Sequence, residues 1–349
     1  MRFHFGERDR DGDGPLDAAV MDACARRGVE AAALMRGVEG FGAKHRLRTD
    51  RLLSLSEDAP LVAVAVGESD VIEGLADEVR GIAAGGLVVL ETVQAQTTGT
   101  GTALAAEVAV PVVGAPEDVV KVTVWGPRTG PTSPHLEAVA ALRRHGADSA
   151  TVLLGVDGVL DGERRRARFV AANRGVPALT VGVGRRSAID AALAEVDDAA
   201  HLVTVEPAVI YRRISTVSHH TEGDGDAGVV PKWRISPPSH HGDASAVRVT
   251  LVTSEIASRG AHPAYLEFIH QLRREGAPGA TALRGVWGFR GEGEPHGDRV
   301  LALRRDVPML VEVVDVPERA ARWLELATSA ACDGDFVYVQ SIPRAITLG

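Results

Sequence analysis

One glycine-rich turn occurs three times in this sequence, and the repetition constrains the fold more than any other feature. The turn reads RGVEGFG at 36–42, LGVDGVL at 154–160 and RGVWGFR at 284–290. When Arg36 is superposed on Arg284, the match continues without a gap as far as Gln94. Such self-similarity at long spacing is the signature of repeated structural units. The chain is therefore predicted to contain three copies of one unit, of which the middle copy is the most diverged.

Each copy shows the same order of expected elements. A β-rich run (2–6, 120–126, 247–253) precedes a helix with apolar residues at i, i+3, i+4 and i+7 spacing, and a glycine (Gly28, Gly146, Gly276) stands where the helix should end. A second strand runs into the repeated turn, and a third strand follows a proline (Pro60, Pro177, Pro308). A second amphipathic helix and a last strand complete the copy. The order β-α-β-β-α-β is that of a ferredoxin-like unit, so the predicted fold class is α+β.

The expected domains are residues 1–94, a diverged second domain at 119–211, and a third at 247–345. Linkers rich in small and polar residues are expected at 95–118 and 212–246. The third strands are apolar nearly throughout, which indicates sheets buried on both faces. Two helices can cover only one face of each sheet. The three sheets are therefore expected to cover one another, with the helices outward, in an intrachain pseudo-trimer.

Composition excludes several classes of protein. The chain has 349 residues and a net charge of −9 without a basic stripe, which argues against a nucleic-acid partner. No apolar run is long enough for a transmembrane helix, and the charged N-terminal stretch is unlike a signal peptide. Two cysteines, Cys24 and Cys332, cannot make a disulfide framework. A cytoplasmic location is the expectation.

The repeated segments resemble a known family. RGVEGFG, DRLLSLSEDAPLVAVAV and GLVVLETV look like the PII-like family called domain of unknown function 190, with copies one and three matching well and copy two weakly. The resemblance implies the ferredoxin-like fold of the trimeric PII signal proteins. It also implies small effectors, often adenine nucleotides, bound in clefts between subunits. A long loop between the second and third strands would then report the bound state to a partner such as a transporter or an enzyme.

The repeated turn supplies the candidate ligand-binding residues. Glycines permit close approach of a ligand to the backbone, exposed N–H groups can form an anion-binding nest, arginine can hold an anion through two hydrogen bonds, and phenylalanine offers a stacking face. The predicted residues are Arg36, Gly37, Glu39, Gly40, Phe41, Gly42 and His45 in copy one, and Arg284, Gly285, Gly288, Phe289 and Arg290 in copy three. The alternative is a purely structural glycine turn with a surface arginine. Copy two has Leu154 and Val159 in place of the arginine and phenylalanine, so at most two clefts are expected to be competent.

No arrangement of residues predicts catalysis. The sequence shows no Ser-His-Asp pattern on strand ends and no carboxylate pair repeated among the copies, so a non-enzyme is expected. The histidine pairs His219-His220 and His240-His241 lack a supporting ligand frame, and no metal site is predicted. The function predicted is a regulatory or sensor protein that needs no cofactor and binds a small anionic effector, with an adenine nucleotide as the candidate. The alternative is a ligand-free protein-interaction scaffold, and in either case the chain is expected to be a monomer.

Overall fold

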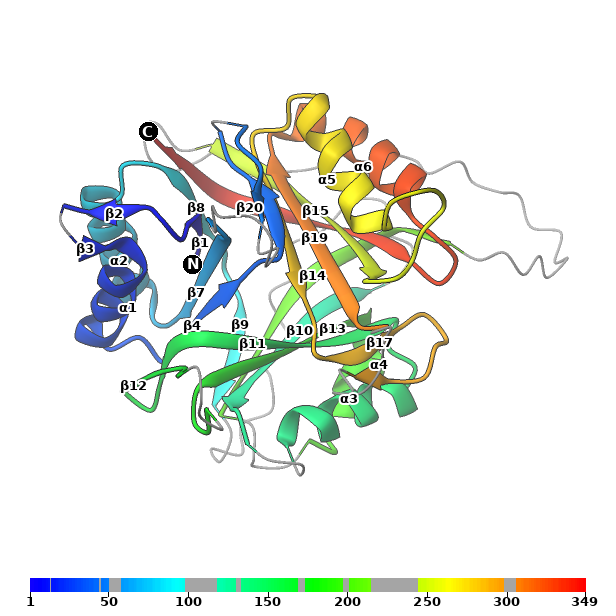
Figure 1. Ribbon diagram of the computed structural model, residues 1–349. Helices are drawn as coiled ribbons and strands as arrows, with labels where there is room; N and C mark the ends of the chain where they lie inside the picture. Colours follow the sequence, from blue (N-terminus) through cyan, green and yellow to red (C-terminus); the bar gives the residue numbers. More distant parts are fainter. Residues whose placement is uncertain are drawn as a thin grey trace, which may run out of the picture.

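Three pairs of helices lie at three corners of the molecule, and the strands run between them (Figure 1). The computed structural model describes residues 1–12, 14–43, 45–49, 58–97, 118–129, 133–168, 173–196, 201–214, 244–297 and 306–349. Each pair of helices belongs to one copy. The predicted α+β class is confirmed, and the described residues form six helices and one large antiparallel sheet with a separate two-stranded ribbon.

Copy one begins with β1 (Arg2–Gly6), a short ribbon of β2 (Arg10–Asp11) and β3 (Gly14–Pro15), and α1 (Leu16–Arg27). It continues with β4 (Ala31–Arg36), β5 (Glu39–Phe41), β6 (Arg48–Thr49), β7 (Pro60–Val66), α2 (Ser69–Ile82), β8 (Gly86–Leu90) and β9 (Gln94–Thr97). Copy two comprises β10 (Val119–Pro127), α3 (Pro134–Arg144), β11 (Ser149–Leu160), β12 (Glu163–Arg166), β13 (Pro177–Arg185), α4 (Arg186–Leu193) and β14 (Leu202–Arg213). Copy three comprises β15 (Ala244–Ser254), α5 (Ala264–Arg274), β16 (Ala280–Arg284), β17 (Trp287–Arg290), β18 (His296–Gly297), β19 (Pro308–Asp315), α6 (Pro317–Ala330) and β20 (Phe336–Leu348).

The four main strands of each copy pair in the same order. The first strand lies between the third and the fourth, and the second strand lies outside the third, as in β4-β7-β1-β8. Copies two and three repeat this order as β11-β13-β10-β14 and β16-β19-β15-β20. The glycines predicted to end the first helices adopt positive φ, with 67° at Gly28 and 77° at both Gly146 and Gly276. Glycine takes up this backbone conformation without the steric penalty of a Cβ.

The last strand of each copy extends into a neighbouring copy. In this way β9 pairs with β14, β14 pairs with β20, and β20 pairs with β8. The pairings run from copy one to two, from two to three, and back to one, so they close on themselves. Residues 94–97 therefore belong to a strand, although a linker was predicted from residue 95. Pairing between copies could not be seen in the local pattern of apolar residues.

A second set of pairings connects the copies through the repeated turn. We call three segments the straps: residues 39–41 of copy one, 155–160 of copy two and 287–290 of copy three. The first strap pairs with β16, the second with β4, and the third with β11. Each strap thus extends the sheet of another copy at its second strand.

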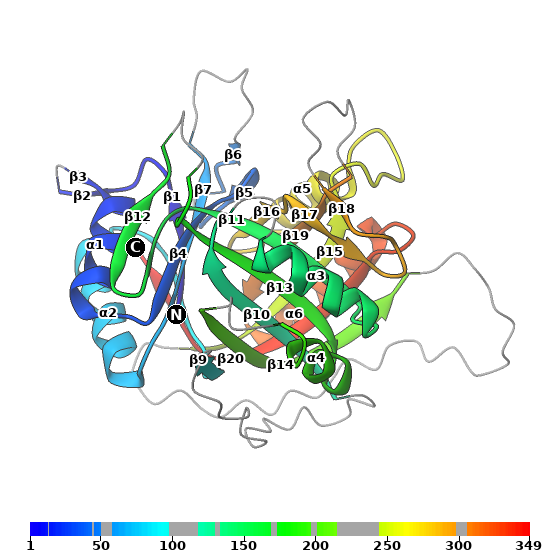
Figure 2. The ribbon, with the colours of Figure 1, turned by 90° about the horizontal axis from the view of Figure 1, so that it is seen from below.

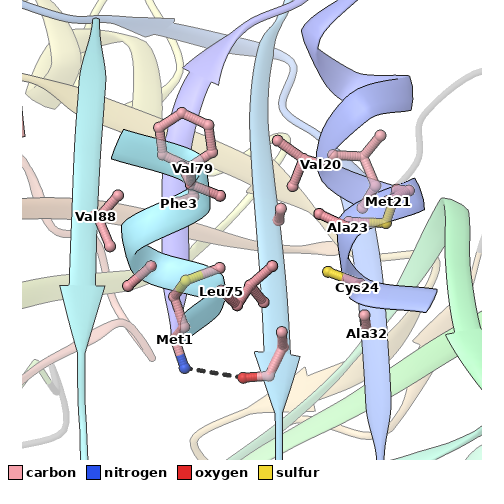
Figure 3. Close-up of a cluster of buried hydrophobic side chains, with 14 of the residues drawn as sticks. Met1, Phe3, Val20, Met21, Ala23, Cys24, Ala32, Leu75, Val79 and Val88 are labelled. Carbon is pink, nitrogen blue, oxygen red and sulfur yellow. Dashed lines mark hydrogen bonds between the residues drawn. The ribbon is translucent and has the colours of Figure 1, made fainter. Parts of the chain in front are cut away.

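The hydrophobic core has an outer and an inner layer. In each copy the two helices cover one face of the sheet; in copy one, Val20 of α1 and Leu75 and Val79 of α2 pack in one cluster with Phe3 of β1 (Figure 3). The other faces of the three sheets meet in a shared central cluster, which includes Met35 and Val62 of copy one, Trp125 and Leu179 of copy two, and Leu310 and Tyr338 of copy three. In the view from below, α1 and α2 lie at the left of the strands, and α3 and α4 lie in front of them (Figure 2). The sheets therefore cover one another, as their apolar third strands predicted.

Buried charges also lie in this central region and link the copies. Arg2 of copy one contacts Glu312 of copy three, and Arg248 of copy three contacts Glu91 of copy one, at N···O distances of 2.9 and 2.7 Å. Lys121 contacts Glu206 within copy two at 2.7 Å, and Gln340 of copy three donates to the same Glu206 at 2.9 Å. Each charge has an opposite partner, which offsets the cost of removing it from water.

Candidate functional site

The glycines of the repeated turn let strands from different copies approach closely. A Cβ added at Gly40 would lie 2.6 Å from the carbonyl oxygen of Ala280 in copy three. At Gly158 the corresponding distance is 2.3 Å, to the carbonyl oxygen of Ala32 in copy one. Real Cβ atoms essentially never approach backbone oxygens so closely, so only glycine fits. This contact explains why the glycines persist in copy two after the arginine and phenylalanine are lost.

The backbone N–H groups predicted to form an anion-binding nest donate to carbonyl groups instead. Gly37 N donates to Pro60 O at 2.8 Å, and Val38 N donates to Ala282 O of copy three at 2.9 Å. Copy three repeats both bonds: Gly285 N donates to Pro308 O at 2.8 Å and Val286 N to Val152 O of copy two at 2.9 Å. An N–H group that is already bonded within the sheet is not free for a phosphate or carboxylate. The nest expected at these positions is therefore not formed.

The phenylalanines of the turn are buried in the core of another copy. Phe41 is 4% exposed and packs among residues of copy three, including Phe268 of α5. Phe289 is 2% exposed and packs among residues of copy two, including Val139 of α3. Val159, at the corresponding position of copy two, is buried in the core of copy one. This apolar side chain anchors each strap, and burial leaves only a small part of its surface accessible.

The arginines of the turn each pair with a glutamate from their own copy. Arg36 Nη2 lies 2.8 Å from Glu7 Oε2, and Arg284 Nη2 lies 2.9 Å from Glu255 Oε2. In copy two, Leu154 replaces the arginine. Arg128 replaces the glutamate, since its backbone N–H makes the equivalent bond to Val176 O. Copy two therefore lacks both the arginine and the glutamate of the ion pair. Their joint replacement indicates that the two side chains serve each other as structural partners.

The other predicted residues of copy one have different surroundings. Glu39 is buried at 3% exposure, whereas a Cβ at Gly42 would meet nothing within 4 Å. His45 stacks on Phe41 with 5.7 Å between ring centroids, and its carbonyl accepts from Arg273 Nε of copy three at 2.7 Å. Ligand binding by the copy-one residues stays a prediction. The observed contacts of Phe41 and His45 hold copy one to copy three.

A cleft of about 390 Å³ lies between copies two and three. Three of the residues predicted in copy three line it: Gly288, Phe289 and Arg290. Sequence reasoning missed most of the others, which come from separate parts of the chain: Asp148, Arg213 and Ile214 of copy two, and Ser254, Gly291–Glu294, His296, Asp306, Pro308 and Asp333–Phe336 of copy three. The closed pairing of the copies brings them together.

Negative charge predominates among the described residues that line this cleft. They include six carboxylate side chains (Asp148, Glu292, Glu294, Asp306, Asp333, Asp335) and two guanidinium groups. Both guanidinium groups already have carboxylate partners: Arg213 Nε lies 2.6 Å from Asp148 Oδ1, and Arg290 Nη1 lies 3.1 Å from Asp335 Oδ1. The described lining thus offers no excess positive charge to an anion.

Asp335 is the most deeply buried carboxylate of the cleft. Its Oδ2 accepts hydrogen bonds from Thr253 Oγ1 and from the backbone N–H of Cys332, each at 2.7 Å. Burial raises the pKa of Asp335 to about 6, although the neighbouring Arg290 acts in the opposite direction. These bonds hold the carboxylate at the wall of the cleft.

Other features of the described residues bear on the sequence predictions. No group of three or more histidine, cysteine, aspartate or glutamate side chains could hold a metal ion within the described ranges. The histidine pairs at 219–220 and 240–241 lie outside them. Cys24 and Cys332 are free and buried. In the part of the chain that the structure describes, no helix combines the length and apolar character needed to cross a membrane.

Comparison with known proteins identifies the family. The model of the DUF190 family, described as "Uncharacterized ACR, COG1993", matches residues 1–95, 128–210 and 246–342. A UPF0166 protein of Aquifex aeolicus (strain VF5) is 31% identical over 75 residues, which cover 22% of this chain and 71% of that relative. No solved structure matches the chain. Because the matched segments cover more than half of its length and one falls in each copy, the chain belongs to the DUF190 family, as three consecutive copies.

Proposed function

We propose that the chain is a PII-like regulatory protein whose three ferredoxin-like copies form an intrachain pseudo-trimer that binds a small effector. The cleft between copies two and three carries the proposal. Its volume of about 390 Å³ is within the range of small-molecule sites, and it lies where two copies meet. The corresponding clefts between subunits are the effector sites that the PII resemblance implies.

An effector in this cleft would contact two copies at once. It would touch the strap of copy three and the strand edge of copy two, so it would favour one arrangement of these elements. The strap of copy three leads directly, through β18, into the connection between the second and third strands. We propose that a partner, such as a membrane transporter or an enzyme, reads the change there. No catalytic role and no cofactor are proposed.

Hydrogen–deuterium exchange of the full chain tests the effector site. Exchange rates are measured for the chain alone and with ATP, ADP, AMP or cyclic AMP. They are measured separately with the cations arginine, agmatine or putrescine, because carboxylates predominate among the described residues that line the cleft. We expect at least one of these compounds to slow exchange in the strap of copy three and at residues 333–336. Unchanged exchange with every compound, on folded protein, would overturn the proposal of an effector in this cleft.

A ligand-free interaction scaffold is the second candidate. It is favoured by the partners of Arg36, Phe41 and Gly40, each of which has a structural contact that needs no ligand. The substitution His296→Arg, which places a bulkier side chain at the cleft, separates the two functions. A sensor would lose its response to the compound that slows exchange. If the protein is a scaffold, neither the wild type nor the His296→Arg variant would respond to the compound, and both would bind the partner protein.

A further inference from the structure

The three copies carry different side chains at one position beside the strap. Arg48 pairs with Gly40 in copy one, Arg165 pairs with Gly158 in copy two, and His296 pairs with Gly288 in copy three. These glycines are the same residue of the repeated turn. Two copies therefore place an arginine at this position, and only the copy whose strap lines the cleft has a histidine.

The guanidinium group of Arg48 fills the equivalent place in copy one. Its Nη2 lies 3.4 Å from Asp9 Oδ1, and its Nη1 lies 3.4 Å from Asp58 Oδ1. A Cβ on Gly6 would lie only 0.9 Å from Nη1, so the guanidinium group occupies the space that a side chain at position 6 would need. Copy one thus binds a guanidinium group of its own chain between two carboxylates.

Among the residues that the structure describes, the same position of copy three borders the cleft. Ser254 stands where copy one has Gly6, since both pair with the proline that begins the third strand. His296 stands in place of Arg48, while Asp306 keeps the carboxylate of Asp58. All three residues of copy three line the cleft. The carboxylate is retained, and the arginine that pairs with it in copy one is absent from this position.

We propose, building on the proposed effector site, that the cleft between copies two and three binds a small molecule through a guanidinium or amine group. The cation takes the place next to Asp306 that Arg48 holds next to Asp58 in copy one. The lining is suited to it, because six carboxylates line the cleft against two guanidinium groups, and these two pair with Asp148 and Asp335, only two of the six. A planar guanidinium group matches a carboxylate through two hydrogen bonds, and an amine binds as a point charge.

Calorimetric titration of the full chain with arginine, agmatine and putrescine tests the class of ligand. We expect at least one of them to bind at one site per chain. Asp306→Asn should weaken that binding at least tenfold, and His296→Arg should abolish it by supplying a tethered guanidinium group. The matched control is Asp58→Asn, which removes the corresponding carboxylate of copy one and should leave the affinity unchanged.

A gain of function provides a second test. Arg48→His combined with Gly6→Ser gives copy one the residues of copy three at both positions. We expect this folded variant to bind two molecules of the compound per chain in place of one. A stoichiometry that stays at one would contradict the equivalence of Arg48 with the bound cation.

The binding results distinguish the proposed cationic ligand from the more general proposal that the cleft is an effector site. Binding of ATP, ADP, AMP or cyclic AMP at the cleft, without binding of the three cations, would overturn the cationic ligand and leave the effector site standing. Binding of none of the compounds would overturn both. Cation binding that Asp306→Asn leaves unchanged would overturn the proposed position of the charge.

Discussion

Arg2 and Glu312 form a buried ion pair that joins the first strand of copy one to the third strand of copy three. Arg2 Nη1 lies 2.9 Å from both carboxylate oxygens, and the two side chains are 9% and 3% exposed. Burial alone would raise the pKa of Glu312, but the positive charges of Arg2 and Arg248 outweigh this effect and lower the pKa from 4.5 to about 2. The folded state therefore favours the ionised carboxylate.

We predict that Glu312→Gln destabilises the protein in a pH-dependent manner. Because the pKa is lower in the folded state, the carboxylate adds stability above its unfolded pKa of 4.5, and this contribution is lost as the pH falls toward 2. The expected loss in free energy of unfolding at pH 7 is about 3 kcal/mol. Urea unfolding between pH 2 and 7 should show the difference from wild type narrowing in acid. A constant difference across this range would refute the charge argument.

The turn glycines give a prediction with a control in the same turn. Gly40→Ala should destabilise the chain by about 1–3 kcal/mol, because its Cβ would collide with the carbonyl oxygen of Ala280. Gly42→Ala meets nothing within 4 Å and should be neutral or slightly stabilising. Thermal and urea unfolding of both variants measure the contrast. Equal effects at the two positions would show that backbone freedom, and not close approach, explains the repeated glycines.

Phe41 should stabilise a copy other than its own. Its ring packs in the core of copy three, so Phe41→Ala should cost about 3–5 kcal/mol and should speed amide exchange in α5 (Ala264–Arg274) more than in α1 (Leu16–Arg27). Phe41→Leu should restore most of the stability. Exchange that rises mainly in α1 would show that the strap does not anchor copy three.

A double-mutant cycle on Arg36 and Glu7 separates a structural pair from a ligand contact. The pair is partly exposed, so its coupling energy should be about 0.2–1 kcal/mol. We expect the two single alanine variants and the double variant to be non-additive by that amount in urea unfolding. Additive effects, together with loss of effector binding in Arg36→Ala alone, would instead support the predicted ligand role of Arg36.

Much of the fold could be predicted from local patterns. The periodicity of Val71, Leu75 and Val79 and the glycine at 28 depend on neighbours within a few residues, and the three-fold repetition reinforced each assignment. The candidate site was predicted only in part. Gly288, Phe289 and Arg290 line the cleft, but Asp148 and Arg213 reach it from another copy. Comparison of aligned positions could have singled out His296, which differs from the arginines at 48 and 165.

The sequence by itself determined the three copies, their order of strands and helices, and the apolar sheet faces that required cover. These properties follow from periodicity and repetition along the chain. The tertiary structure alone decided which copy each strap joins, because strand pairing between distant segments depends on shape and backbone hydrogen bonding that no local pattern records. It also decided where the cleft lies, because the residues that line it come from two copies and from separate parts of the chain.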